Sequence, residues 1–267
     1  MSTAEQAIPA RTSASEGTFR NLRRFNLIMG AFHLIQGILM LALSNDFTVP
    51  IQTYFLKFVE GEGLVSDPQT WFDLPFGPLV ASFLFMSAAA HLIVSLPGVY
   101  EWYVRNLKRG INKARWIEYS FSASVMIVAI ATLFGMYDVA GLLALFALNA
   151  AMILFGWMME LHNQTTERTN WTAFIFGCIV GIVPWIAIGI YFVGSVTSGE
   201  EVPGFVYAIY VSLFLFFNVF AVNQYLQYKK VGRWQDYVFG EKMYIVLSLV
   251  AKSLLAWQVF FGTLQPS

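Results

Sequence analysis

The sequence contains little charge and only one cysteine. Asp, Glu, Lys and Arg make up 12% of its 267 residues, about half of the ~25% typical of soluble domains. The lone Cys178 excludes a disulfide framework and a cysteine-based metal site, so we expect it to serve packing inside an apolar segment. The formal net charge is zero, and the composition therefore gives no sign of a nucleic-acid partner.

The N-terminal residues lack the apolar core of a secretory signal peptide. Residues 1–20 are polar and rich in Ser, Ala and Thr, which predicts a disordered cytoplasmic tail rather than a cleaved leader. The remainder, residues 21–267, is expected to form one membrane-embedded domain, since 57% of the chain is hydrophobic and 17% is aromatic.

Seven apolar segments, each of about 20 residues or more, predict an all-α membrane protein built as a seven-transmembrane helix bundle. They cover residues 25–44, 75–96, 116–136, 139–161, 171–194, 205–228 and 243–262. Most connections are short, so we expect sequence neighbours to pack as antiparallel neighbours. The long first loop, residues 45–74, contains the β-like run IQTYFLKFV and predicts a small extracellular β-hairpin.

The distribution of Lys and Arg predicts the orientation of the bundle. Apart from Lys252, 14 basic residues fall in the N-terminal tail and the loops on its side, and Lys57 alone falls on the other side. Loops rich in Lys and Arg mark the cytoplasmic face. We therefore predict a multi-pass protein of the cell membrane with a cytoplasmic N-terminus and an extracellular C-terminus.

The last apolar segment carries a single charge, Lys252, near its middle. Counted from Glu241 at ~1.5 Å per residue, Lys252 lies roughly 16 Å into a hydrocarbon core about 30 Å thick. A charge at that depth costs at least ~2.5–3.5 kcal/mol, so it is expected to face the bundle interior and to need a partner. A functional lysine is favoured over a snorkelling one, because the amine cannot easily reach either interface.

Glu118 is the carboxylate that we expect to pair with Lys252. The alternative is an interfacial carboxylate paired with Arg115, three residues earlier. Ser122 and Ser248 each lie four residues from one member of the pair and therefore share its helix face. The spacing predicts a polar cluster around the two charges.

His33 and His91 lie in the first and second apolar segments. A buried histidine is most often hydrogen-bonded to a carbonyl or a water. These two could line a hydrated cavity on the cytoplasmic side of the lysine, or they could be paired ligands of a haem. Their depths in the two segments are only roughly level, which argues mildly against haem.

Aromatic, sulfur-containing and amide side chains are dense near the expected level of Lys252. They are Tyr119, Met126, Asn149, Met152, Trp185, Phe214 and Phe217. Each alone is typical of an ordinary core. As a set around a midplane lysine, they would suit a long, flat, apolar ligand.

Three glycines, Gly177, Gly181 and Gly189, recur at multiples of four in one apolar segment. Small residues at this spacing let another helix approach closely. The approaching helix belongs either to the same bundle or to a second copy of the chain.

Several stretches carry a family resemblance. They are WIEYSFSASVMIV at 116–128, LNAAMILFGW at 148–157, GCIVGIVPWI at 177–186, VPGFVY with SLFLFFN within 202–218, QYLQYK at 224–229 and YIVLSLVAKSLLAWQ at 244–258. In these motifs the chain resembles the heliorhodopsins, a family of microbial rhodopsins with inverted membrane topology. The resemblance extends over nearly all of the chain after Asn21, and the motif that contains Lys252 is very specific.

The resemblance implies a light-sensing photoreceptor that binds retinal. All-trans retinal would be attached covalently to Lys252 as a protonated Schiff base, with Glu118 as the counterion. Light would isomerise the retinal to the 13-cis form in a slow photocycle, and the protein would be a homodimer. The residues placed near the Schiff base are Ser122 and Ser248, and those in the cytoplasmic-side cavity are His33 and His91.

The apolar segments lack the second carboxylate that a proton pump would need. Ion-pumping rhodopsins usually carry it one turn before the lysine, where this chain has Ser248. We therefore predict a photosensor without ion pumping, whose output passes through basic cytoplasmic loops to an unknown signalling partner. The alternatives are a haem-binding electron carrier and a non-retinal transporter that uses Lys252 and Glu118. No nucleophile–base set suggests an enzyme.

Overall fold

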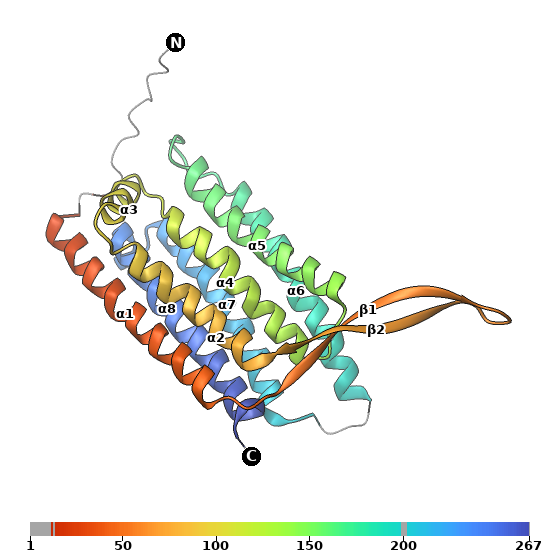
Figure 1. Cartoon of the computed structure of the whole chain (residues 1–267). Coiled ribbons are helices and arrows are strands. Elements are labelled where there is room, and N and C mark those ends of the chain that lie inside the picture. The colour runs from red at the N-terminus through yellow and green to blue at the C-terminus, as the bar shows by residue number, and fades with distance from the viewer. Residues whose placement is uncertain (1–11, 13, 199–201, 267) are drawn as a thin grey trace, which may run out of the picture.

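A computed structural model describes residues 12, 14–198 and 202–266. Seven long helices form one bundle (Figure 1), and all seven are long and apolar enough to cross a membrane. The predicted seven-helix membrane protein is therefore confirmed. In chain order the helices are α1 (Glu16–Leu43), α2 (Phe76–Ile93), α4 (Lys113–Leu133), α5 (Val139–His162), α6 (Thr172–Thr197), α7 (Gly204–Lys229) and α8 (Tyr237–Val259), which a π-helical turn extends to Leu264.

The two ends of the bundle differ in charge. At one end, which we call the basic end, α1, α4, α6 and α8 begin. The helix ends and connections there together carry most of the Lys and Arg residues. The C-terminus and the β-hairpin lie at the opposite end, which we call the hairpin end (Figure 1).

The seven helices pack in a ring of neighbours, of which α4 is one. Contacts run from α1 through α2, α4 and α5 to α6, and from α7 through α8 back to α1. The α4 helix is the most enclosed of the seven spans and also contacts α6 and α7. Aromatic pairs join α6 and α7 near both ends of the bundle. The distance between ring centroids is 5.0 Å for Phe192 and Tyr207, and 5.3 Å for Trp171 and Tyr225.

The hairpin half of the bundle has a dry apolar core. Its buried side chains include Val80, Ile130 and Val259. From Lys252 towards the hairpin end, the described part of the chain buries no Asp, Glu, Lys or Arg. Apart from Thr132, the described buried polar residues lie near the level of Lys252 or in the basic half.

A short helix that the sequence did not predict, α3 (Val99–Lys108), lies across the basic end (Figure 1). It buries Tyr103 and Leu107 against Phe19 at the start of α1, and it exposes its charged face. Ten residues are too few to span a bilayer, so a search for long apolar segments passes over such an amphipathic helix.

Helix α1 begins earlier than predicted, within the expected disordered tail. Residues 1–11 and 13 of that tail lie outside the described residues, whereas Glu16 to Arg20 are helical. The Ser15 hydroxyl accepts a hydrogen bond from the backbone N–H of Thr18 at 3.2 Å and caps the helix. The prediction was therefore wrong for residues 16–20, because this N-cap and the contacts of Phe19 extend the helix beyond its apolar segment.

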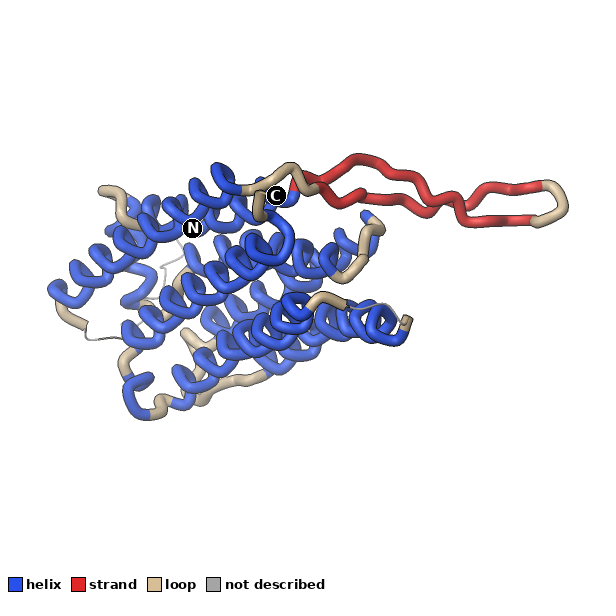
Figure 2. Tube along the Cα trace, turned by 90° about the horizontal axis from the view of Figure 1, so that it is seen from below, coloured by secondary structure: helices blue, strands red, loops and turns tan. Residues whose placement is uncertain are grey.

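The long first loop folds into the predicted β-hairpin, which is larger than expected. Strand β1 (Thr48–Val59) pairs antiparallel with β2 (Gly63–Pro75), and the hairpin extends well beyond the bundle (Figure 2). At its base Val49 and Ile51 are buried against the helices, whereas Phe58 near its tip is 74% exposed.

Candidate functional site

Lys252 lies in the middle of α8 and points into the bundle, where it is 3% exposed. Its Nζ donates hydrogen bonds to Glu118 Oε1 at 2.9 Å, to Ser248 Oγ at 3.1 Å and to Ser87 Oγ at 2.5 Å. The three bonds use every donor of an ammonium group, and the carboxylate supplies the opposite charge. The structure thus brings Lys252 and Glu118 together with their hydrogen-bonding capacity satisfied, which makes a buried ion pair tolerable.

Ser87 of α2 belongs to this polar group, although the sequence analysis did not single it out. It donates to Glu118 Oε1 at 2.6 Å and accepts from Lys252. The sequence did contain a signal, because Ser87 lies four residues before His91 and therefore shares its helix face. The same spacing, measured from Glu118, drew attention to Ser122.

Ser122 is fully buried on α4, one turn after Glu118. Its Oγ forms no hydrogen bond within the described part of the chain. Of the two serines expected beside the charged pair, the structure therefore bonds Ser248 to Lys252 but leaves Ser122 close by without a bond.

The two histidines stack against each other between α1 and α2. Their ring centroids are 5.7 Å apart and their planes are 15° from parallel. His91 Nδ1 lies 2.7 Å from Asn26 Oδ1, whereas neither ring nitrogen of His33 has a partner among the described residues. Stacked rings do not face each other across an iron atom, so the geometry argues against paired haem ligands.

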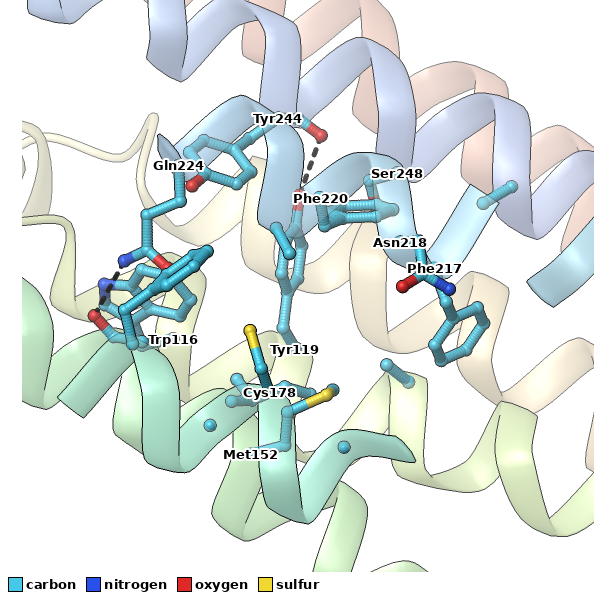
Figure 3. Close-up of a pocket in the computed structure, with 18 of the residues that line it drawn as sticks. Trp116, Tyr119, Met152, Cys178, Phe217, Asn218, Phe220, Gln224, Tyr244 and Ser248 are labelled. Atoms are coloured by element: carbon cyan, nitrogen blue, oxygen red, sulfur yellow. Dashed lines mark hydrogen bonds between the residues drawn. The ribbon is translucent and has the colours of Figure 1, made fainter. Parts of the chain in front are cut away.

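A cavity of about 170 Å³ begins at Lys252 and runs between α4, α5, α6, α7 and α8 (Figure 3). Its walls are mainly aromatic, aliphatic and sulfur-containing, and Lys252 is the one charged side chain among the described residues that line it. The lining residues that the sequence analysis named are Tyr119, Met126, Met152, Trp185, Phe217 and Ser248.

Two residues expected in the wall do not line the cavity. Asn149 Nδ2 donates to Ser124 Oγ at 3.1 Å and ties α5 to α4. Phe214 packs edge-on against Trp185, with the ring centroids 5.5 Å apart, and supports the wall from behind. The level of a residue along a helix does not give the direction of its side chain, so the sequence could not separate these two residues from those that line the cavity.

Several lining residues were missed in the sequence, namely Trp116, Phe220, Gln224 and Tyr244. The Tyr119 hydroxyl donates to the backbone carbonyl of Tyr244 at 2.8 Å and joins α4 to α8 beside the cavity (Figure 3). The ring of Trp116 fills the space over Gly156, where a Cβ would lie 2.5 Å from it. Cys178, expected to be packed, is exposed on α6 and lies at the edge of the cavity.

The glycines of α6 make close contacts inside the bundle. A Cβ at Gly181 would lie 2.3 Å from Met152 Sδ, and one at Gly189 would lie 2.8 Å from the Tyr210 hydroxyl. Gly177 likewise packs against α5. Of the two alternatives for this spacing, packing within the bundle is the one observed.

The site suits a long apolar molecule with one reactive end. The cavity offers an apolar tunnel and a single amine, and the amine already has a carboxylate beside it. A comparison with protein-family models matches the heliorhodopsin family over residues 22–264. The chain belongs to the heliorhodopsin family. Membership makes it a retinal-binding, light-sensing rhodopsin, and the cavity that ends at Lys252 fits such a chromophore. No curated protein matches the chain.

This member of the heliorhodopsin family also buries a second ionic cluster, nearer the basic end. Arg115 pairs with Glu160 of α5 through its NH2 group at 2.5 Å and with Glu241 of α8 through its NH1 group. All three side chains are at most 7% exposed. Arg115 is thus engaged with these two carboxylates rather than with Glu118, which excludes the alternative partner considered for Glu118.

Glu160 and Glu241 are absent from the inventory of buried ionisable groups made from the sequence. One stands at the end of an apolar segment and the other just before one, where a carboxylate is usually solvated. Their burial depends on an arginine from a third helix. The available signal was that Arg115, at the start of its helix, needs another carboxylate once Glu118 is assigned to Lys252.

A smaller cavity, of about 40 Å³, lies between the Lys252–Glu118 pair and the Arg115 cluster. Near the lysine it is lined by Ser87, His91 and Glu118, and towards the basic end by Arg115 and Glu241. The cavity is therefore polar at both ends and connects the charged pair with the second cluster.

Proposed function

We propose that Lys252 binds all-trans retinal covalently through its amine, as a protonated Schiff base, and that Glu118 is the counterion. The observation that carries the proposal is the position of Lys252 Nζ at the end of the apolar cavity, 2.9 Å from Glu118 Oε1. Bound in this way, retinal supplies the absorption of visible light and the change from the all-trans to the 13-cis form.

The polar residues beside Lys252 keep its nitrogen protonated and fix its position. The negative charge of Glu118 stabilises a proton on that nitrogen. Ser87 donates to the same carboxylate oxygen and fixes its position, while Ser248 lies within hydrogen-bond distance of the nitrogen. Tyr119, whose ring centroid is 5.1 Å from Lys252 Nζ, adds a cation–π contact and closes one side of the site.

The apolar walls restrict the shape of the ligand and keep water out. The Trp185 ring meets Phe217 edge-on, with their centroids 5.3 Å apart, and Met152 packs over Gly181, one turn before Trp185 on α6. A flat chain fits between such walls, whereas a bulky or charged ligand does not. This confinement supports a chromophore over a transported substrate.

We propose a photosensor with a slow photocycle and no ion pumping. Pumping would need an acidic relay on both sides of Lys252, and towards the hairpin end the described residues bury no charged side chain. A proton that leaves the nitrogen is therefore retained in the basic half of the bundle.

The same reasoning gives an orientation and partners. The basic end is assigned to the cytoplasm, because loops rich in Lys and Arg stay there, and a cytoplasmic signalling partner would bind these loops.

A homodimer is supported by the β-hairpin, since Phe55 and Phe58 are 62% and 74% exposed. An isolated two-stranded hairpin is at best marginally stable in water, and a second copy of the chain would cover it.

The test is the visible spectrum of the purified protein after addition of all-trans retinal. The wild type is expected to develop a visible band that hydroxylamine removes, and Lys252→Ala is expected to develop none. Lys252→Arg is the matched control, because it keeps a buried charge beside Glu118 but cannot form the imine. A band of normal intensity in either variant would refute attachment at Lys252.

A further inference from the structure

The Arg115 cluster carries more negative charge than positive charge. One guanidinium faces two carboxylates, Glu160 and Glu241, and the formal sum is −1 in a buried site. Further titratable groups near the cluster are the phenols of Tyr103, Tyr237 and Tyr244. Phenols are neutral near pH 7 and leave this sum unchanged. The uptake of one proton would therefore make the cluster neutral, which a low-dielectric site favours.

The two carboxylates differ in the hydrogen bonds that they accept. Hydrogen bonds to the charged form of a carboxylate keep it ionised. Glu160 accepts such bonds, in addition to Arg115, from Trp116 Nε1 at 2.5 Å and the backbone N–H of Asn112 at 2.9 Å. Glu241 accepts, in addition to Arg115, one from Asn112 Nδ2 at 2.7 Å and a long contact, 3.5 Å, from Gln227. Of the two, only Glu241 lines the smaller cavity.

Gln227 offers an acceptor for a proton on Glu241. Its Oε1 is buried and has no hydrogen-bond partner among the described residues, while its Nε2 donates to the backbone carbonyl of Tyr237 at 3.2 Å and lies 3.5 Å from Glu241 Oε1. A half-turn of the amide would break the bond to Tyr237, and it would let a protonated Glu241 donate to Oε1. Gly240 leaves room beside the amide, because a Cβ there would lie 2.8 Å from Gln227 Nε2.

The smaller cavity supplies the route from the lysine. At about 40 Å³ it has room for roughly two water molecules, and its walls offer each of them several polar partners. It extends from Glu118 and His91, beside the lysine, to Glu241. Eleven residues along α8 separate Lys252 from Glu241, roughly 16 Å at ~1.5 Å per residue, so bridging groups are required.

We propose that Glu241 is the carboxylate that accepts the proton released from the Lys252 nitrogen. The proposal rests on the proposed function, since it assumes that this nitrogen gives up its proton after illumination. An N–H bond breaks at Lys252 and an O–H bond forms on Glu241, with no transfer of electrons. Arg115 stays protonated, and the uncompensated negative charge passes from the cluster to Glu118.

The first experiment is light-minus-dark infrared difference spectroscopy of the full chain with all-trans retinal. The wild type is expected to gain the carbonyl-stretch band of a protonated carboxylic acid when the visible band is lost. Glu241→Gln should lose this carboxylic acid band. Glu160→Gln, the same change at the other carboxylate that pairs with Arg115, should keep this band. A band that survives in Glu241→Gln and disappears in Glu160→Gln would overturn the assignment.

A second variant guards against misfolding. Glu241→Asp keeps a carboxylate and is expected to shift the position of the carboxylic acid band without abolishing it. A band with an unchanged position in this variant would also refute Glu241 as the acceptor.

The second experiment needs no retinal. Acid titration of the protein without added retinal, followed by the same carboxylic acid band, is expected to show one contribution, among those of the other Asp and Glu residues, that Glu241→Gln removes and Glu160→Gln leaves. If Glu241 stays ionised until the protein unfolds, the proposal is refuted, even where the visible spectrum supports the attachment of retinal to Lys252. A protein that forms no visible band but shows this titration would refute the proposed function alone.

Discussion

Replacing Glu118 by Gln removes the negative charge beside Lys252 and preserves the size of the side chain. The N–O distance of 2.9 Å places the two charge centres about 4 Å apart. At an effective dielectric constant of about 20, charges at that distance attract by about 4 kcal/mol. Each ~1.36 kcal/mol is tenfold in a protonation equilibrium, so the protonated form of the lysine nitrogen should lose roughly a thousandfold in stability.

The assay is a pH titration of the visible band in the retinal-loaded protein. In Glu118→Gln we expect a smaller or shifted visible band at neutral pH, and an acid shift in the midpoint at which protonation restores it. Ser120→Ala is the control on the same helix, because the Ser120 hydroxyl donates to the backbone carbonyl of Ile117 at 2.8 Å and not to the charged pair, and it should change the midpoint little. If the spectrum and the midpoint of Glu118→Gln match the wild type, Glu118 is not the counterion.

Three further predictions concern the walls and the supports of the site. Ser87→Ala removes a hydrogen bond to the Glu118 carboxylate and one from Lys252, and each bond to a charged group contributes about 1.5–3 kcal/mol. The absorption maximum of the retinal-loaded protein should therefore shift, and an unchanged maximum would contradict a role for Ser87. Gly181→Leu places a side chain where Met152 lies 2.3 Å from a Cβ and should block formation of the visible band on addition of retinal, while circular dichroism shows a folded protein. Arg115→Met leaves two buried carboxylates unpaired and should lower the free energy of unfolding by about 3–5 kcal/mol. Tm should fall clearly at neutral pH and fall less in acid, where the carboxylates become protonated.

The helices and the central charged pair follow from local patterns in the sequence. The length of each apolar segment predicts a span, and a lone charge in the last one requires a partner, which only a few residues could provide. The hairpin was signalled by the β-like run IQTYFLKFV, but its length depends on pairing between Thr48 and Pro75, 27 positions apart, which composition does not define.

The wall of the cavity could be predicted only in part, because the rotation of each helix is not encoded locally. Helix α7 is apolar around its whole circumference, so the sequence does not distinguish Phe214, which lies behind the wall, from Phe220, which lines the cavity. The burial of Glu160 and Glu241 is also a long-range property, since it exists only where α4, α5 and α8 converge on Arg115.

The separation of a polar half from a dry half has an electrical consequence. A membrane voltage falls mainly across the part of a protein with the lowest polarisability, which here is the apolar core at the hairpin end. Moving one elementary charge across the entire membrane at 100 mV changes the energy by about 2.3 kcal/mol. A proton that travels only between Lys252 and Glu241 crosses a small fraction of that voltage. We therefore expect illumination to produce almost no photocurrent, and the sensor to report light independently of the energetic state of the cell.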